Sequence, residues 1–141
     1  MIYYLDTNIL VFLITEQKDE ICPDVQEIFS DYGGKLLAST VCVHELMHLY
    51  QLNKLPFKRK AKAPVLAEVL GWLDEMGIEI VPVTRHHLEK FAVLPLYDDH
   101  RDPNDRLIIA QAITDRVALI SSDHKFSRYR KDGLDFIFNE R

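Results

Sequence analysis

Short apolar runs alternate along this chain with longer segments in which apolar residues recur at helical spacing. The short runs are typical of buried strands and cover Ile2–Leu5, Leu36–Ala38, Ile78–Val83, Val117–Ile120 and Phe136–Phe138. The longer segments predict helices over residues 8–16, 23–31, 40–53, 63–76, 85–93 and 103–116. Strands that alternate with helices predict right-handed crossovers and a sheet covered by helices on both faces. We therefore expect an α/β fold around a mainly parallel, about five-stranded sheet.

Residues with strong conformational preferences mark where the predicted helices begin and end. Proline suits the first turn of a helix, because its missing N–H would have no partner there. Side chains that accept hydrogen bonds predict helix N-caps, and a glycine predicts a helix end. These markers are the prolines Pro23, Pro64 and Pro103, the caps Thr7 or Asn8, Ser39, Thr84 and Asp102, and the glycine Gly77.

Composition and charge narrow the class of protein. The 141 residues, 48% of them hydrophobic, predict one domain over residues 1–141 with a substantial core. A net charge of -5 argues against a protein that coats nucleic acid, but it leaves room for a local basic patch. Cys22 and Cys42 lack metal-site or redox-motif spacing, which fits a reducing compartment. We find no leader and no apolar run of ~20 residues, so we expect a cytoplasmic protein without a membrane segment.

Four acidic residues stand at positions where an α/β sheet places its ligand site. Asp6 ends the first strand, Asp123 follows a late strand, and Asp105 lies in the first turn of a helix. The fourth, Glu45, lies inside a helical pattern among apolar neighbours. Because the carboxyl ends of parallel strands share one edge, Asp6 and Asp123 should face the same crevice. Clustered carboxylates repel one another, so they indicate a site for Mg²⁺ or Mn²⁺ that can activate a water against a phosphoryl group.

Each acid also has a simpler interpretation. Asp6 could cap the first helix, Glu45 could be a solvated helix residue, and Asp123 could begin a turn. Asp105 could close a capping box with Asp102, and capping is the interpretation that we favour for Asp102 because it precedes Pro103. Each signal alone is weak, but four acids in these contexts together favour a site.

Four segments, in this order, resemble the PIN-domain ribonucleases, and within them the VapC-like toxins of toxin–antitoxin pairs. They are Leu5–Asn8, Ser39–Leu46, the specific run His100–Ala112, and Ser121–Phe126. The resemblance implies a compact three-layer α/β/α sandwich around a parallel sheet. This fold agrees with the alternation of strands and helices.

The resemblance also implies a function. It implies a Mg²⁺- or Mn²⁺-dependent endoribonuclease that cleaves single-stranded or structured RNA by metal-activated water at Asp6, Glu45, Asp105 and Asp123. It implies supporting roles near the metal for Thr7, Asn8, Asp102 and Ser121. It further implies a homodimer that a partner antitoxin protein holds inactive.

A second motif overlaps the predicted site. The run His44-Glu45-Leu46-Met47-His48 matches the H-E-x-x-H helix of zinc peptidases, with Glu68 as a conceivable third ligand. The metzincin extension fails, because Gln51 and Lys54 stand where Gly and His should be. The zinc interpretation also leaves the three aspartates unexplained. A zinc peptidase and a non-catalytic interaction module of PIN shape therefore stay open as the alternatives.

Basic and apolar residues outside the acids suggest contacts with partners. The densest basic run is either a solvated loop or a rim that grips RNA phosphates, and consists of Lys54, Lys58, Arg59, Lys60 and Lys62. Further rim candidates are Arg85, His86, His87, His100, Arg101, Lys125, Arg128 and Arg130, with Phe57 and Tyr97 as possible base-stacking residues. Some apolar residues of the early helices could form a partner surface, drawn from Ile9, Leu10, Phe12, Leu13, Leu46, Leu49, Tyr50 and Leu52.

Overall fold

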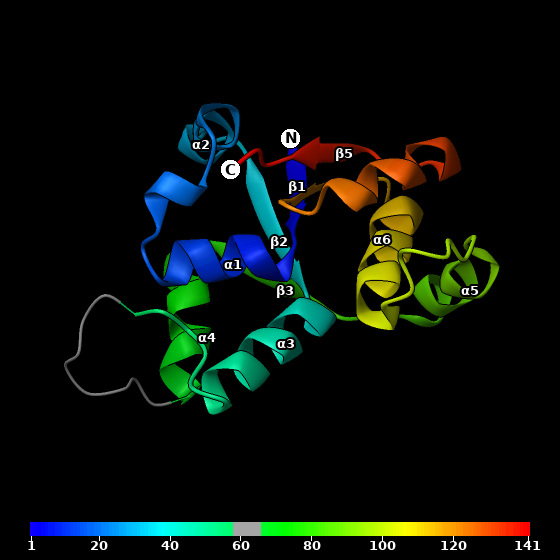
Figure 1. The fold of residues 1–141 in the computed structure, drawn as a ribbon. Coiled ribbons are helices and arrows are strands. Elements are labelled where there is room, and N and C mark those ends of the chain that lie inside the picture. Colours follow the sequence, from blue (N-terminus) through cyan, green and yellow to red (C-terminus); the bar gives the residue numbers. More distant parts are fainter. Residues whose placement is uncertain (58–65) are drawn as a thin grey trace.

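A single parallel sheet organises the computed structural model, which describes residues 1–57 and 66–141 (Figure 1). Its strands are β1 (Ile2–Leu5), β2 (Lys35–Ser39), β3 (Ile78–Val81), β4 (Ala118–Ser121) and β5 (Phe136–Phe138). Their order in the sheet is β3-β2-β1-β4-β5, and every neighbouring pair is parallel. The chain thus builds outward from β1 in one direction and then returns to build β4 and β5 on the other side. The strand order reverses between β1 and β4, where open α/β sheets place their ligands.

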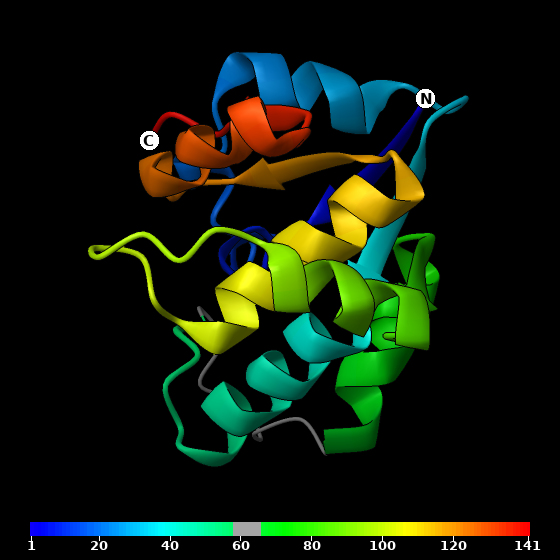
Figure 2. The same ribbon diagram turned by 90° about the vertical axis from the view of Figure 1, so that its right-hand side faces the viewer.

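Helices cover both faces of the sheet, as predicted. They are α1 (Thr7–Ile14), α2 (Pro23–Ser30), α3 (Thr40–Gln51), α4 (Leu66–Glu75), α5 (Arg85–Val93) and α6 (Pro103–Asp115), with the 3₁₀ helices η1 (Lys18–Glu20) and η2 (His124–Asp132). In Figure 1, α1, α2 and α4 lie on the left of the strands, and α5 and α6 lie on the right. Figure 2 shows α5 and α6 side by side in front of the sheet, and α3 contacts both α1 and α6. The predicted three-layer α/β/α architecture is confirmed.

Several element boundaries differ from the predicted ones for identifiable reasons. The third strand ends at Val81 rather than Val83, because Pro82 has no N–H to continue the pairing. The first helix is capped by Asp6, not by Thr7 or Asn8, which lie inside it. The predicted start of the fourth helix at residues 63–65 lies outside the described residues. Gly77 follows that helix with a φ of 72°, as its predicted role requires.

The core lies on both faces of the central strands. Tyr4 and Leu5 of β1 and Leu119 and Ile120 of β4 are buried, which explains why these strands are continuous apolar runs. Part of the apolar surface that the sequence suggested for a partner belongs to this core instead, because these residues pack inside the protein. They are Ile9, Leu10, Phe12 and Leu46, which are all buried. Among the described helices, none has the length and apolar character needed to cross a membrane.

A hydrogen-bond network ties α5 and α6 to the centre of the sheet. The Tyr4 hydroxyl donates to Oδ2 of Asp115 at 2.5 Å, and His87 Nε2 lies 2.9 Å from Oδ1 of the same carboxylate. The Thr84 N–H donates to His87 Nδ1, so the ring proton lies on Nε2 and points at Asp115. Gln111 Nε2 donates to the Tyr4 hydroxyl at 3.2 Å. Burial and the neighbouring Asp115 raise the pKa of Tyr4, which therefore stays a neutral donor.

The substitution Tyr4→Phe removes the donor to Asp115 and leaves the rest of the core in place. We expect the free energy of unfolding to fall by about 1.5–3 kcal/mol, the effect of a lost hydrogen bond to a charged group. Urea denaturation measures it, with Tyr32→Phe as the control, because Tyr32 is fully exposed. Equal midpoints for the two variants would show that the network does not stabilise the fold.

Candidate functional site

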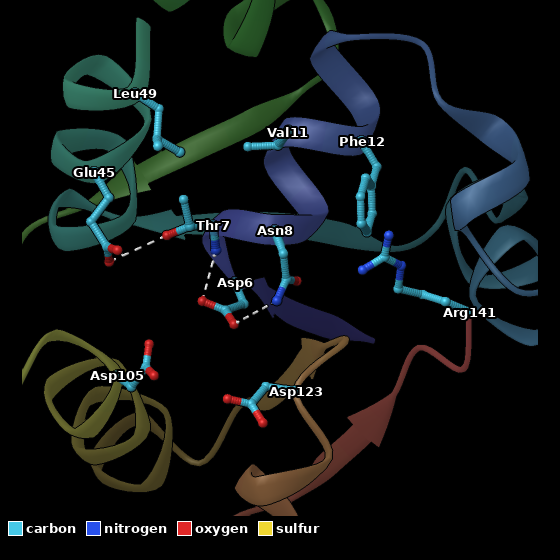
Figure 3. Close-up of a pocket in the computed structure, with 10 residues that line it drawn as sticks. All are labelled: Asp6, Thr7, Asn8, Val11, Phe12, Glu45, Leu49, Asp105, Asp123 and Arg141. Atoms are coloured by element: carbon cyan, nitrogen blue, oxygen red, sulfur yellow. Dashed lines mark hydrogen bonds between the residues drawn. The ribbon is translucent and has the colours of Figure 1, made fainter. Parts of the chain in front are cut away.

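A pocket of about 400 Å³ opens where the strand order reverses (Figure 3). Its lining comes from the ends of β1 and β4, from α1, α3 and α6, and from the segment after β5. It consists of Asp6, Thr7, Asn8, Val11, Phe12, Glu45, Leu49, Asp105, Asp123 and Arg141. All four acids singled out in the sequence are in this set. Figure 3 shows Glu45 and Asp6 facing Asp105 and Asp123 across the pocket.

Asp6 lies at the centre of the pocket and also caps α1. It follows β1 directly and is 4% exposed. Its Oδ1 accepts a hydrogen bond from the Thr7 N–H at 2.7 Å, and its Oδ2 accepts one from the Ser121 hydroxyl at 2.6 Å. The Asn8 amide adds a longer contact to Oδ2 at 3.3 Å. The capping role considered for Asp6 and a place in the pocket therefore coexist.

Ser121 connects the two strands on which the pocket is built. It ends β4, is fully buried, and donates to Asp6 beyond β1. The same hydroxyl oxygen accepts from the Asp123 N–H at 3.0 Å. The Asp123 carboxylate in turn caps η2 by accepting from the Lys125 N–H at 2.9 Å. One hydroxyl thus fixes the backbone that carries Asp123 relative to the Asp6 side chain.

Glu45 reaches the pocket from α3. The residue after it, Leu46, is fully buried, which anchors this turn of the helix against the core. The Thr7 hydroxyl donates to Oε1 of Glu45 at 3.3 Å. Thr7 therefore contacts two acids of the pocket, Asp6 through its N–H and Glu45 through its hydroxyl.

Asp105 enters from the first turn of α6 and meets a histidine that sequence reasoning had assigned elsewhere. His100 is 4% exposed, and its Nε2 lies 3.4 Å from Oδ2 of Asp105. This nitrogen is buried without a hydrogen-bond partner, a condition that ordinarily costs about 1–3 kcal/mol. The sequence predicts His100 as a candidate RNA contact and as the start of the run that resembles PIN domains, but not as a partner of the acids. Its position five residues before Asp105 is the sequence signal that could have placed it near the acids.

Burial and mutual repulsion raise the pKa values of three of the acids. Burial is the largest cause for each of them, followed by the charges of the other acids for Glu45 and Asp105. The pKa of Asp6 rises to about 6, although the Ser121 and Thr7 hydrogen bonds oppose the rise. The pKa of Glu45 rises to about 7 and that of Asp105 to about 8. An arrangement in which several carboxylates resist ionisation together is one that a bound cation would relieve.

The donor atoms of the pocket fit a divalent cation. One atom each from His100, Asp105 and Asp123 lies within 4.8 Å of the others. Carboxylate oxygens are the ligands that Mg²⁺ and Mn²⁺ prefer. The His100 Nε2 atom, which has no hydrogen-bond partner, is a further possible metal ligand. The residues present are therefore chemically suited to hold such an ion.

Asp102 has the capping role that we favoured for it. It is exposed, and its Oδ1 accepts from the N–H groups of Asn104 and Asp105 at 2.8 and 3.1 Å. Its charge still raises the pKa values of Asp6, Glu45 and Asp105. Asp102 therefore acts on the pocket in two ways: its negative charge raises the pKa values of the acids, and its side chain caps the helix α6 that carries Asp105.

The two histidines of the H-E-x-x-H motif lie away from any third ligand. His44 and His48 are both exposed on α3, and Glu68 is exposed on α4. In the described part of the chain, the group of potential ligands close enough to share an ion contains none of these three residues. Glu45 faces the aspartates instead.

The basic residues and aromatic residues proposed for RNA binding are in varied surroundings. Of the densest basic run, Lys54 is exposed after α3, while Lys58, Arg59, Lys60 and Lys62 lie outside the described residues. The proposed roles of His87 and His100 as exposed contacts are wrong, because both are buried. Others are engaged within the protein: Lys125 and Arg128 both contact Asp99, Arg130 lies over the Phe136 ring, Phe57 packs on Trp72, and the Tyr97 hydroxyl donates to Asp132.

Arg141 is a lining residue that sequence reasoning did not identify. Its guanidinium lies 5.0 Å from the centre of the Phe12 ring, and its Nε contacts Glu20 at 2.6 Å. It is the basic member of the described pocket lining. No pattern in the sequence marks it, because its position depends on packing against α1.

Comparison with known proteins matches residues 3–132 to the PIN domain family. Three solved structures share the fold over nearly their whole length. VapBC2 from Rickettsia felis, bound to a DNA fragment from its promoter, is 21% identical with a TM-score of 0.65 and 98% of each chain covered. VapBC-1 from nontypeable Haemophilus influenzae is 17% identical, with a TM-score of 0.67 and 100% of each chain covered. A toxin–antitoxin complex from Klebsiella pneumoniae is 16% identical, with a TM-score of 0.68, covering 99% of this chain and 98% of that chain. No curated protein matches the sequence significantly.

The raised pKa values predict how the stability of the metal-free protein depends on pH. Between the unfolded pKa near 4 and folded values of about 6 to 8, the folded chain binds more protons than the unfolded chain. The free energy of unfolding in EDTA should therefore fall as pH rises from 5 to 8, by on the order of 2 kcal/mol after allowance for screening.

Urea denaturation of the wild type and of Asp105→Asn at each pH measures this dependence. The variant should show the shallower slope, because it lacks the Asp105 carboxyl that titrates over this range. Adding Mn²⁺ should restore stability most at pH 8. Parallel slopes would mean that Asp105 has no raised pKa.

Proposed function

The chain belongs to the PIN domain family, and from this premise we propose that it is a metal-dependent endoribonuclease that acts as the toxin of a toxin–antitoxin pair. The observation that carries the proposal is the meeting of Asp6, Glu45, Asp105 and Asp123 in one pocket at the reversal of strand order. These acids come from four separate segments of the chain. Stability alone gives no reason to gather them, because their mutual repulsion is unfavourable.

We assign Mg²⁺ or Mn²⁺ to this pocket, held by the four acids as one or two ions. When bound, such an ion lowers the pKa of a water and neutralises the charge that develops on a phosphodiester. The protein contributes acids whose side chains are already oriented by hydrogen bonds before an ion binds. Both oxygens of Asp6 already accept hydrogen bonds, from Thr7 and from Ser121, and Thr7 also holds Glu45. Asn8 and Asp102 support the same arrangement, through the Asp6 contact and the start of α6 respectively.

We propose RNA, single-stranded or structured, as the substrate of this cytoplasmic enzyme. An acidic pocket needs basic groups nearby to hold a polyanion, since phosphate contacts position a nucleic acid. Arg141 in the pocket lining and the exposed Lys54 beyond α3 are the described residues that we assign to this role. Phosphate contacts of this kind carry no sequence information, so selectivity for one RNA has to come from other contacts.

The proposed partner is an antitoxin protein bound to a homodimer of this chain. Similar folds occur in VapBC2, in VapBC-1 and in a toxin–antitoxin complex, which support this assembly by analogy. Part of the apolar surface predicted from the early helices remains accessible. Leu13, Leu49 and Tyr50 are partly buried, and Leu52 at the end of α3 is 48% exposed.

Removal of one site carboxylate should abolish cleavage. We expect Asp6→Asn and Asp105→Asn each to lower the rate of RNA cleavage in Mn²⁺ by at least about 100-fold, because a ligand and its charge are lost. Cleavage of a mixed RNA pool, with Mn²⁺, with Zn²⁺ and with EDTA, measures the effect. Asp24→Asn is the matched control, since Asp24 is an exposed acid in the first turn of α2, as Asp105 is in the first turn of α6.

The same assay separates the alternatives. His44→Asn and His48→Asn should retain full nuclease activity, whereas a zinc peptidase would depend on both histidines. Full activity in both aspartate variants would refute the site. If the wild-type protein cleaves no RNA with any of these metals, and the RNAs tested include candidate tRNAs, the result would favour the non-catalytic module.

An antitoxin should bind through the exposed end of α3. We expect the protein to run as a dimer by light scattering, and to form a complex with the product of an adjacent small gene that suppresses its cleavage activity. Leu52→Glu should weaken that complex by about tenfold or more, because a charge would have to be buried at the contact. Tyr32→Glu, at a fully exposed position, is the control. A monomer whose activity is unaffected by the neighbouring product would exclude this assembly.

A further inference from the structure

We propose that His100 supplies a nitrogen ligand to the cation of this pocket, so that the centre is a mixed nitrogen–oxygen site with Asp105 and Asp123 that selects Mn²⁺ over Mg²⁺. The inference rests on the proposed function, because it concerns the same pocket. It adds a residue that lies outside the four acids and changes the chemistry of the site that they form.

The position of His100 matches that of a ligand. Its Nε2 lies 3.4 Å from Oδ2 of Asp105. Adjacent ligands of an octahedral cation with bonds of about 2.1 Å lie about 3 Å apart. An oxygen of Asp123 completes the group, with all three donor atoms within 4.8 Å of one another. The His100–Asp105 pair is already near this spacing, and a movement of the Asp123 carboxylate toward them would bring the third atom to ligand spacing.

The His100 nitrogen has no other use in the described structure. It is buried, its side chain is 4% exposed, and it makes no hydrogen bond. A purely structural histidine in the core would be expected to satisfy both ring nitrogens, as His87 does with Thr84 and Asp115. His100 satisfies only one, and the other lies 3.4 Å from Asp105, in the group of potential ligands that includes Asp123.

The surroundings of the ring hold it in this direction. His100 Nδ1 lies 2.8 Å from the hydroxyl of Tyr129, which is fully buried. The rings of Phe126 and Tyr129 pack edge-on against the imidazole, each at 5.4 Å between ring centres. A histidine that binds a metal through one nitrogen commonly donates its other N–H to an oxygen, which fixes the tautomer. With a cation on Nε2, the Tyr129 hydroxyl would be that oxygen.

The protonation state of the ring agrees with this role. Burial lowers the pKa of His100, which favours the neutral imidazole that metal binding requires. Asp99, Asp102 and Asp123 oppose this shift, and Lys125 adds to it.

A nitrogen ligand changes which metal the pocket prefers. Mg²⁺ favours oxygen ligands and retains its waters, whereas imidazole suits the transition metals. Loss of His100 should therefore weaken Mn²⁺ binding more than Mg²⁺ binding. A site built from carboxylates alone would show no such difference.

Pulsed electron paramagnetic resonance of the Mn²⁺-loaded full chain tests the proposal without an activity assay. We expect modulation from a directly bound ¹⁴N nucleus in the wild type, and its loss in His100→Gln. By titration, His100→Gln should raise the Kd for Mn²⁺ by about tenfold or more and the Kd for Mg²⁺ by less. His86→Gln, an exposed histidine on α5, should change neither property.

The possible outcomes separate this inference from the proposed function. Mn²⁺ that binds and drives cleavage without nitrogen coupling, or coupling that persists in His100→Gln, would overturn the inference and leave the four acids in place. A wild type that binds no Mn²⁺ would overturn both. If His100→Gln does not fold, the wild-type spectrum decides alone, and Tyr129→Phe should keep the nitrogen signal while weakening Mn²⁺ binding by about 10-fold or more.

Discussion

Repulsion among four carboxylates at one edge of the sheet is the constraint on which the site depends. Asp6, Glu45, Asp105 and Asp123 share a pocket, and the pKa values of three of them are raised by burial and by one another. Each neutral hydrogen-bond donor beside these carboxylates stabilises a negative charge that burial and repulsion disfavour. Thr7 donates to two of the acids, Ser121 donates to Asp6, and the fold brings these donors from both sides of the reversal in strand order. A bound cation would therefore complete an arrangement that the protein has only partly balanced.

Asp6 shows why the alternatives weighed for a single residue need not exclude one another. Its carboxylate caps α1 and at the same time lies at the centre of the pocket. Helix capping fixes Oδ1 on the Thr7 N–H, and Ser121 fixes Oδ2. A residue that begins a helix in this way cannot rotate freely, so the helix itself aligns the Asp6 carboxylate.

The strands and most helices were predictable because buried parallel strands are continuous apolar runs and helix ends carry prolines, caps and glycines. The parallel direction predicted for the strands also placed Asp6 and Asp123 at one edge of the sheet. What escaped prediction depends on contacts between distant segments. The direction of His100 is set by Tyr129, twenty-nine residues later, and Arg141 reaches the pocket through its contacts with Phe12 and Glu20. The 3₁₀ helix η2 was missed because it is mostly charged and buries only Phe126 and Tyr129, too few apolar positions to show a period.

The hydroxyl bridge from Ser121 to Asp6 joins residues 115 positions apart in the chain. During synthesis the segment with Asp6 is made well before its partner on β4 and the acid that follows. A nascent chain that stops before β4 has Asp6, Glu45 and Asp105 without the strand that aligns them. The proposed cleavage activity would then arise only after β4 has been made. Chains that stop earlier would not cleave RNA, so they would be harmless to the cell that makes them.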